Sequence, residues 1–131
     1  MKGLSVSRFI ARVARAKKAK DVCVLNVRRW TIIAEYFVIM SATSAPHRRA
    51  LMEEIEKKIK EKYNVLPTRV DGRWETDWTA MDYASVLVHI FIGSSRETYR
   101  IEKLYSQARE IRFVKGKNQR KHTRNPKRKV R

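Results

Sequence analysis

The chain has 131 residues, 43% of them hydrophobic, so it can bury one core but has little length left for a second domain. Its formal net charge is +18, its single cysteine excludes an internal disulfide, and no apolar run reaches the length of a membrane span. Seven basic and no acidic residues lie in residues 1–20, and ten and none in residues 111–131, whereas residues 21–110 are nearly neutral. A nearly neutral body is therefore flanked by two cationic ends.

The first half of the sequence predicts a helix, two strands and a second helix. Apolar residues at three- and four-residue spacing predict a helix over residues 4–19. Residues 22–27 and 36–41 are short apolar runs rich in β-branched residues, which is typical of buried strands. Ser44 is a candidate N-cap for a helix that continues to about Tyr63.

The second half predicts three strands and a third helix. Asn64 can end the preceding helix, and residues 65–70 could form a strand whose proline favours an edge position. Residues 77–83 are a further strand candidate, and residues 86–92 (VLVHIFI) have the continuous apolar pattern of a central strand.

The last predicted helix begins where Ser94 is followed three residues later by Glu97, which is the spacing of a capping box. Its apolar face would carry Ile101, Leu104, Tyr105 and Ala108. This order of elements predicts an α/β (α+β) fold, with one mixed β-sheet of about five strands flanked by helices.

The C-terminal segment differs in composition from the rest of the chain. We expect a domain over residues 1–110 and a basic tail over residues 111–131, which has too few apolar residues to fold alone. A cationic, acid-free tail favours RNA over an anionic membrane as its partner, because it has almost nothing to insert into lipid. The predicted RNA-contacting residues are Lys115, Lys117, Arg120, Lys121, Arg124, Lys127, Arg128, Lys129 and Arg131.

The sequence lacks the residue groups that enzymes and metal sites need. The three histidines lie far apart, and Cys23 lies in an apolar run typical of a buried thiol. Neither a Gly-rich phosphate loop nor a Gly-x-Ser-x-Gly motif is present, and His89, inside a strand, is interpreted as structural. We therefore expect no catalysis, no cofactor and no metal. A metal-dependent transferase built on Glu75 and Asp77 is the alternative.

Several segments, in conserved order and spacing, resemble the Iojap, or ribosomal silencing factor, family. Residues 33–39 (IAEYFVI) are similar to the family's "IADYFVI" stretch, and residues 77–83 (DWTAMDY) contain its Trp and its Asp–aromatic pair. Residues 86–91 (VLVHIF) and 96–105 (RETYRIEKLY) resemble its "VVHIF" strand and its "REFYxLExLW" helix. The resemblance covers about residues 8–106.

The chain also departs from the family pattern at four positions. Ala84, Ser85 and Ala42 replace a Gly, an Asp and a Gly, and Tyr105 replaces the final Trp. These changes bear on the shape of the binding face more than on the fold, and the basic tail lies outside the resemblance.

The resemblance implies a fold similar to nucleotidyltransferases without their catalytic residues. It also implies binding to the large ribosomal subunit through ribosomal protein L-fourteen, which blocks subunit joining and so represses translation or guards an assembly intermediate. Family members are also seen as dimers, so the resemblance allows a homodimer of the free chain. The alternative function is an RNA-binding assembly factor that acts mainly through its basic ends.

A basic partner would select an acidic and aromatic surface on this chain. The predicted partner-binding residues are Asp77, Trp78, Asp82, Tyr83, Glu97, Tyr99, Glu102 and Tyr105. For the Trp and the last two Tyr residues, a place in the core is the competing interpretation.

Because the first predicted helix belongs to the domain, little room is left for a removable presequence. This favours a bacterial cytoplasm, with the mitochondrial matrix as the alternative.

Overall fold

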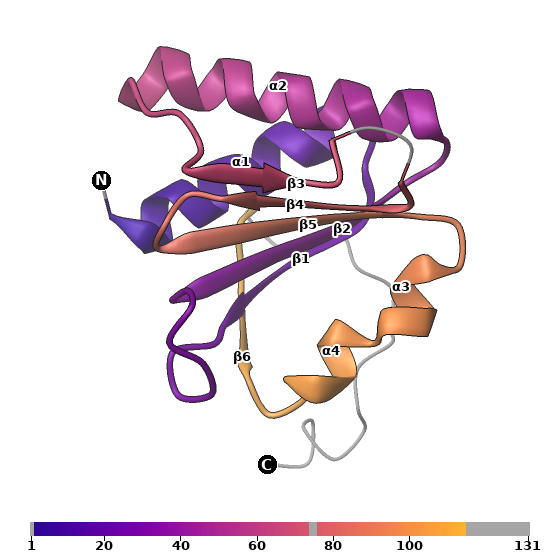
Figure 1. The fold of residues 1–131 in the computed structure, drawn as a ribbon. Coiled ribbons are helices and arrows are strands. Elements are labelled where there is room, and N and C mark those ends of the chain that lie inside the picture. Colours follow the sequence, from indigo (N-terminus) through magenta and orange to yellow (C-terminus); the bar gives the residue numbers. More distant parts are fainter. Residues whose placement is uncertain (1, 74–75, 115–131) are drawn as a thin grey trace.

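A computed structural model describes residues 2–73 and 76–114, and it places one six-stranded sheet between two layers of helices (Figure 1). The strands follow the order β3-β4-β5-β2-β1-β6, in which β2 and β5 pair parallel and the other neighbours pair antiparallel. The predicted mixed sheet flanked by helices is therefore confirmed, with six strands where about five were expected. The strands are β1 (Lys20–Asn26), β2 (Tyr36–Ala42), β3 (Arg69–Asp71), β4 (Trp78–Asp82), β5 (Val86–Ile92) and β6 (Arg109–Ile111).

Two longer helices, α1 (Gly3–Ala16) and α2 (Ala45–Tyr63), lie side by side on one face of the sheet (Figure 1). Helix α2 begins after Ser44, whose Oγ accepts a hydrogen bond from the backbone N–H of His47 at 3.2 Å. It ends at Asn64, which has the left-handed φ of 57° that favours Asn or Gly. The predicted cap and end of this helix are both confirmed.

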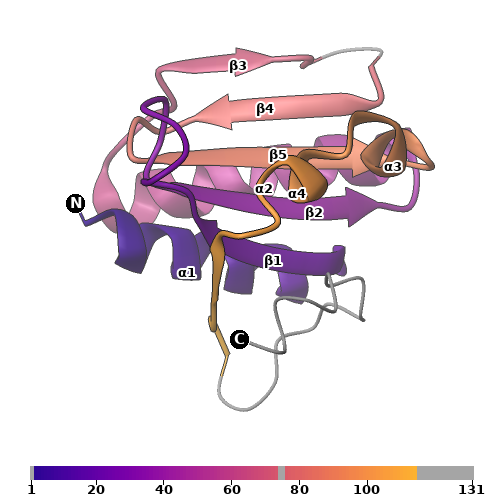
Figure 2. The same cartoon turned by 90° about the horizontal axis from the view of Figure 1, so that it is seen from below.

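Two short helices, α3 (Ser95–Tyr99) and α4 (Ile101–Leu104), lie on the opposite face (Figures 1 and 2). The prediction of one continuous helix was wrong, because Arg100 has a left-handed φ of 52° that separates the two. The predicted capping box does not form either, since the Ser94 side chain makes no capping hydrogen bond. The segment after α4 returns to the sheet as β6, which pairs with β1 and was not predicted as a strand.

Hydrophobic side chains fill both faces of the sheet, which explains why β2 and β5 are apolar almost without interruption. Along β2, Val38 and Met40 face α1 and α2, whereas Phe37 and Ile39 face the opposite side. On that opposite side they pack with Cys23, Leu25, Phe91, Ile101 and Ala108. This second, smaller cluster supports the candidate site.

The packed body extends beyond residue 110, where the domain was expected to end. Phe113 is buried in the cluster below α1, and Arg8 and Arg12 of α1 donate hydrogen bonds to the carbonyls of Arg112 and Phe113, each at 3.0 Å. Residues 111–114 therefore pack against the first helix. The tail residues predicted to contact RNA, from Lys115 to Arg131, lie outside the described residues.

Candidate functional site

The Trp78 side chain lies at the border between the second core cluster and solvent. Its ring stacks on that of Phe91 in the neighbouring strand, with centroids 5.2 Å apart and an interplanar angle of 27°. The ring also contacts Tyr99 of α3, with centroids 4.4 Å apart, and Tyr99 lies 6.2 Å from Phe91 as well. Trp78 therefore packs on the core and is also partly exposed, and its contact with a partner stays a prediction.

His89 of β5 forms a hydrogen bond with the Trp78 indole. The indole Nε1–H donates to His89 Nδ1 at 3.1 Å, so this ring nitrogen is the acceptor. Burial lowers the pKa of His89 to about 3, because the charged imidazolium would lose its hydration. The imidazole is therefore neutral at physiological pH, as a structural histidine should be.

Tyr99 is the exposed part of the site, with 45% of its surface accessible. Asp77, beside Trp78, and Glu97, on α3, are also exposed. Ser95 fixes the start of α3, because its Oγ donates to the carbonyls of Asp77 and Ile92 at 2.9 and 2.7 Å. We call the two rings with these two flanking carboxylates the Trp78–Tyr99 patch.

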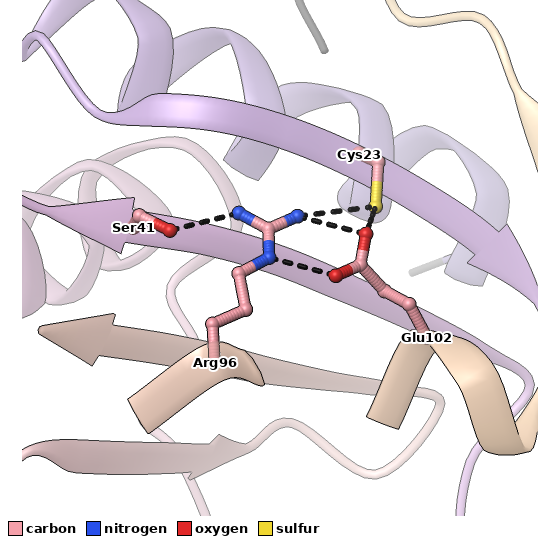
Figure 3. A network of polar contacts seen from close by, with 4 residues as sticks. All are labelled: Cys23, Ser41, Arg96 and Glu102. Carbon is pink, nitrogen blue, oxygen red and sulfur yellow. Dashed lines mark hydrogen bonds and ion pairs between the residues drawn. The ribbon is translucent and has the colours of Figure 1, made fainter. Parts of the chain in front are cut away.

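A partly buried ion pair joins α3 and α4 (Figure 3). Arg96 of α3 forms two parallel hydrogen bonds with the carboxylate of Glu102 in α4, at 2.8 and 2.9 Å. The same guanidinium donates to Ser41 Oγ of β2 at 2.9 Å and lies 3.9 Å from Cys23 Sγ of β1. One side chain thus joins both short helices to two strands of the sheet.

The structure brings only part of the predicted partner-binding set together. Asp77, Trp78, Glu97, Tyr99 and Glu102 belong to the same end of the sheet, but Glu102 is engaged by Arg96 and is only 24% exposed. Fewer of the predicted residues therefore lie together and exposed than the sequence suggested.

The other three predicted residues lie elsewhere. Asp82 is at the far end of β4, where its carboxylate accepts the N–H of Ala84 at 2.8 Å and stabilises a turn. Tyr83 is 2% exposed and points to the α2 side, where burial raises the pKa of its phenol. Tyr105 packs edge-on against Phe37, with centroids 5.0 Å apart. Tyr83 therefore offers no surface for a partner in this fold.

Sequence reasoning also missed residues that the structure brings forward. Arg96 lies in the 96–105 segment that resembles the family, but its ion pair with Glu102 was not predicted. In one continuous helix, residues six positions apart point to different sides and do not contact each other. The β1–β2 loop exposes Trp30, Ile32 and Ile33, at 43%, 103% and 59%. These three apolar residues, in a segment between two predicted strands, could have indicated an exposed apolar loop from the sequence alone.

Within residues 2–73 and 76–114, no group of three or more His, Cys, Asp or Glu side chains is placed to hold a metal ion. Glu75, one of the two residues of the alternative metal site, lies outside that part of the chain. In the same residues no helix is both long and apolar enough to cross a membrane.

Comparisons with known proteins agree on one family. A family model described as "Ribosomal silencing factor during starvation" matches residues 4–131. The ribosomal silencing factor of Bacillus subtilis is 28% identical over 115 residues, which cover 88% of this chain and 97% of that protein. A mouse protein named "Mitochondrial assembly of ribosomal large subunit protein 1" is 32% identical over 75% of this chain, which spans only 44% of that longer protein.

Solved structures show the same fold. A crystal structure of a Chromobacterium violaceum protein superimposes with a TM-score of 0.77 at 23% identity, covering 88% of this chain and 95% of that one. A Bacillus halodurans crystal structure gives a TM-score of 0.66 at 25% identity, covering 83% and 95%. The order of strands and helices described above is thus found in other proteins of similar length.

Proposed function

The chain belongs to the family of ribosomal silencing factors, and from this premise we propose that it binds the large ribosomal subunit through ribosomal protein L-fourteen. Bound there, it obstructs joining of the small subunit. It acts by occupying a surface and catalyses no reaction. The same obstruction can silence translation or protect a large subunit during assembly, and relatives carry names of both kinds.

The Trp78–Tyr99 patch is the observation that supports this proposal. Aromatic side chains that are already packed lose little entropy on binding and bury a large area, which makes them common anchors of interfaces. Asp77, which precedes Trp78, and Glu97, on the same short helix as Tyr99, are exposed acidic residues on a chain whose formal net charge is +18. Exposed carboxylates near the rings suit a basic ribosomal protein better than RNA phosphates.

The family contains bacterial, mitochondrial and chloroplast proteins. We place this chain on ribosomes of a bacterial cytoplasm, with the mitochondrial matrix as the alternative. The protein could form a homodimer when free, which sedimentation of the isolated chain would test.

Substitution of the patch should weaken binding to large subunits. Tyr99→Ala removes a partly exposed ring and should lower affinity by about tenfold, which equals ~1.4 kcal/mol, because truncation of an interface anchor costs over ~1 kcal/mol. Trp78→Ala should weaken binding by at least ~2 kcal/mol, roughly thirtyfold. Cosedimentation with purified large subunits and a pull-down with isolated L-fourteen measure both effects.

Trp30→Ala is the matched control, since Trp30 is an aromatic residue of nearly equal exposure (43%) in the β1–β2 loop, at the opposite end of β2 from the patch. It should leave the affinity for L-fourteen unchanged. Wild-type chain that travels equally with joined ribosomes and free large subunits would contradict the block of subunit joining. Unchanged affinity of a folded Trp78→Ala variant would contradict the assignment of the patch.

A second candidate function is an RNA-binding assembly factor acting through the basic ends. It is favoured by α1, whose Arg12 and Arg15 are exposed and are followed by exposed Lys17 and Lys18. Direct titration with naked ribosomal RNA separates the two functions. Binding to RNA as tight as binding to intact subunits, with no effect of Tyr99→Ala, would support the second function and overturn the first.

A further inference from the structure

The short helices that carry Tyr99 cannot hold their own conformation. Helix α3 has five residues and α4 has four, whereas isolated helices need roughly 12–15 residues to be even marginally stable in water. Between them Arg100 adopts a left-handed φ of 52°, which costs a non-glycine residue about 1–2 kcal/mol. Contacts with the rest of the molecule must therefore fix both the path and the angle of this segment.

Arg96 supplies the polar part of those contacts. Its pair with Glu102 spans six residues and bridges the break at Arg100, so it fixes the angle between the two helices instead of stabilising either one. The Arg96 and Glu102 side chains are only 12% and 24% exposed, and a two-pronged guanidinium–carboxylate pair keeps its geometry best when water is excluded.

The pair is also tied to the sheet. The guanidinium donates to Ser41 Oγ in β2 at 2.9 Å, while Glu102 Oε2 lies 3.6 Å from Cys23 Sγ in β1 (Figure 3). Tyr99 lies between Arg96 and Glu102 in the sequence, immediately before the break. The position of its ring over Trp78 therefore depends on the pair below it.

We propose that Arg96 is a positioning residue for the Trp78–Tyr99 patch, because its pair with Glu102 clamps α3 and α4 against β1 and β2. This inference rests on the proposed function in that the patch is taken as the surface that binds the large subunit. The clamp itself does not depend on any partner. When it is broken, the helices lift from the sheet and Tyr99 loses its place over Trp78.

The chain contains its own reporter of the clamp. Cys23 is the single cysteine of the sequence, and it is fully buried beneath Arg96 and Glu102. Reaction of the native full-length chain with N-ethylmaleimide therefore measures how often the segment lifts. Arg96→Ala should accelerate the reaction by about tenfold or more, since opening exposes the thiol without global unfolding.

Arg73→Ala is the matched control. It removes an ion pair of similar length, 2.9 Å to Glu56, on the α2 side of the sheet. It should leave the labelling rate of Cys23 and the affinity for large subunits unchanged. Equal labelling rates in wild type and Arg96→Ala would overturn the clamp, and so would equal acceleration by Arg73→Ala, because general destabilisation would then explain both.

Binding measurements test the positioning role with a double-mutant cycle. Arg96→Ala should weaken large-subunit binding by about tenfold in the wild-type background but less than about threefold in the Tyr99→Ala background, because the ring it positions is already gone. Arg96→Lys should recover part of the affinity, since it keeps the charge but not the two-pronged geometry. Full additivity of the two substitutions would overturn the positioning role.

The two proposals can fail separately. If the wild-type chain does not bind large subunits, the proposed function fails, while thiol labelling still decides whether the clamp exists. If the wild-type chain binds and Arg96→Ala labels rapidly with unchanged affinity, the clamp exists but the positioning role is overturned.

Discussion

At the scale of single residues, His89 connects the core to the surface. Its ring is 3% exposed and contacts Phe37 edge-on, with centroids 4.7 Å apart, while Nδ1 accepts the Trp78 indole N–H. A proton on Nδ1 would break this hydrogen bond and place a charge among aromatic rings. Burial therefore lowers the pKa of His89 from its ordinary value of 6.5 to about 3.

This pKa shift predicts a loss of stability in mild acid. Between the unfolded pKa of 6.5 and the folded pKa of about 3, the unfolded chain binds a proton at this site that the folded chain does not. The free energy of unfolding should therefore fall as the pH drops below 6.5, by up to about 1.4 kcal/mol per pH unit. Urea unfolding at pH 7 and at pH 4.5 measures the fall.

His89→Gln is the comparison, because it keeps a polar side chain at this position but does not titrate. It should show a smaller fall between the two pH values, by about 2 kcal/mol or more. The carboxylates are common to both chains, so their contribution cancels in the difference. An equal fall in the two proteins would show that another group controls the acid sensitivity.

At the scale of elements, the β3–β4 hairpin is joined to α2 by one buried side chain. Arg48 of α2 is 1% exposed and donates to the carbonyl of Gly72 at 3.0 Å and to Thr79 Oγ1. The Thr79 hydroxyl in turn donates to the same Gly72 carbonyl at 2.6 Å. The Gly72 carbonyl therefore accepts from two donors, of which Arg48 connects the turn to α2 and Thr79 connects it to β4.

Gly72 and Gly93 make a matched pair for testing this turn. Both have a positive φ, 74° and 61°, but a Cβ on Gly72 would collide with the Trp78 carbonyl, whereas one on Gly93 would meet nothing within 4 Å. Gly93→Ala should cost only the backbone strain of about 1–2 kcal/mol. Gly72→Ala should cost about 1–3 kcal/mol more, because the neighbouring backbone must also move.

Thermal or urea unfolding of the two variants measures the difference in the free energy of unfolding. Equal destabilisation by the two substitutions would mean that the turn can shift without cost and that the Arg48 anchor does not restrain it.

At the scale of the whole molecule, charge is divided by position in the chain. Residues 21–110 are nearly neutral, whereas the ends carry seven and ten basic residues without acids. Trp78 packs against the second core cluster, and α3, which carries Tyr99, lies on the side of the sheet opposite α1 (Figure 1). The proposed site selection by the patch and the predicted electrostatic attraction by the basic ends can therefore be tested separately.

Removal of residues 115–131 should flatten the salt dependence of large-subunit binding. Each basic residue that neutralises a phosphate contributes roughly 0.7–0.9 to the slope of log affinity against log salt. A full-length chain with the tail Lys and Arg replaced by Gln controls for length and should match the truncation. An unchanged slope in either variant would show that the tail residues from Lys115 to Arg131 do not contact RNA.

Local patterns were sufficient for the elements whose stability is local or whose faces are both buried. Helix α2 begins after Ser44 and ends before Asn64 as predicted, because capping depends on the residue and its immediate neighbours. Residues 86–92 form β5 as predicted, since a strand covered on both faces is recognised by its continuous apolar run and no alternation is required. The resemblance of the quoted segments to one family was confirmed by the family match.

Only the tertiary structure decided which side chains meet. Alternation along β4 and the next residue places Trp78 on the α3 side of the sheet and Met81 and Tyr83 on the α2 side. The sequence order therefore predicts that the two aromatic residues lie on opposite faces, but it does not predict which face is exposed. The break at Arg100 and the pairing of β6 with β1 left no local signal, because their stability comes from residues far away in the chain. Sequence alone determined the family, the sheet and the charged ends, whereas long-range packing decided that Trp78, Tyr99 and Arg96 would form one site.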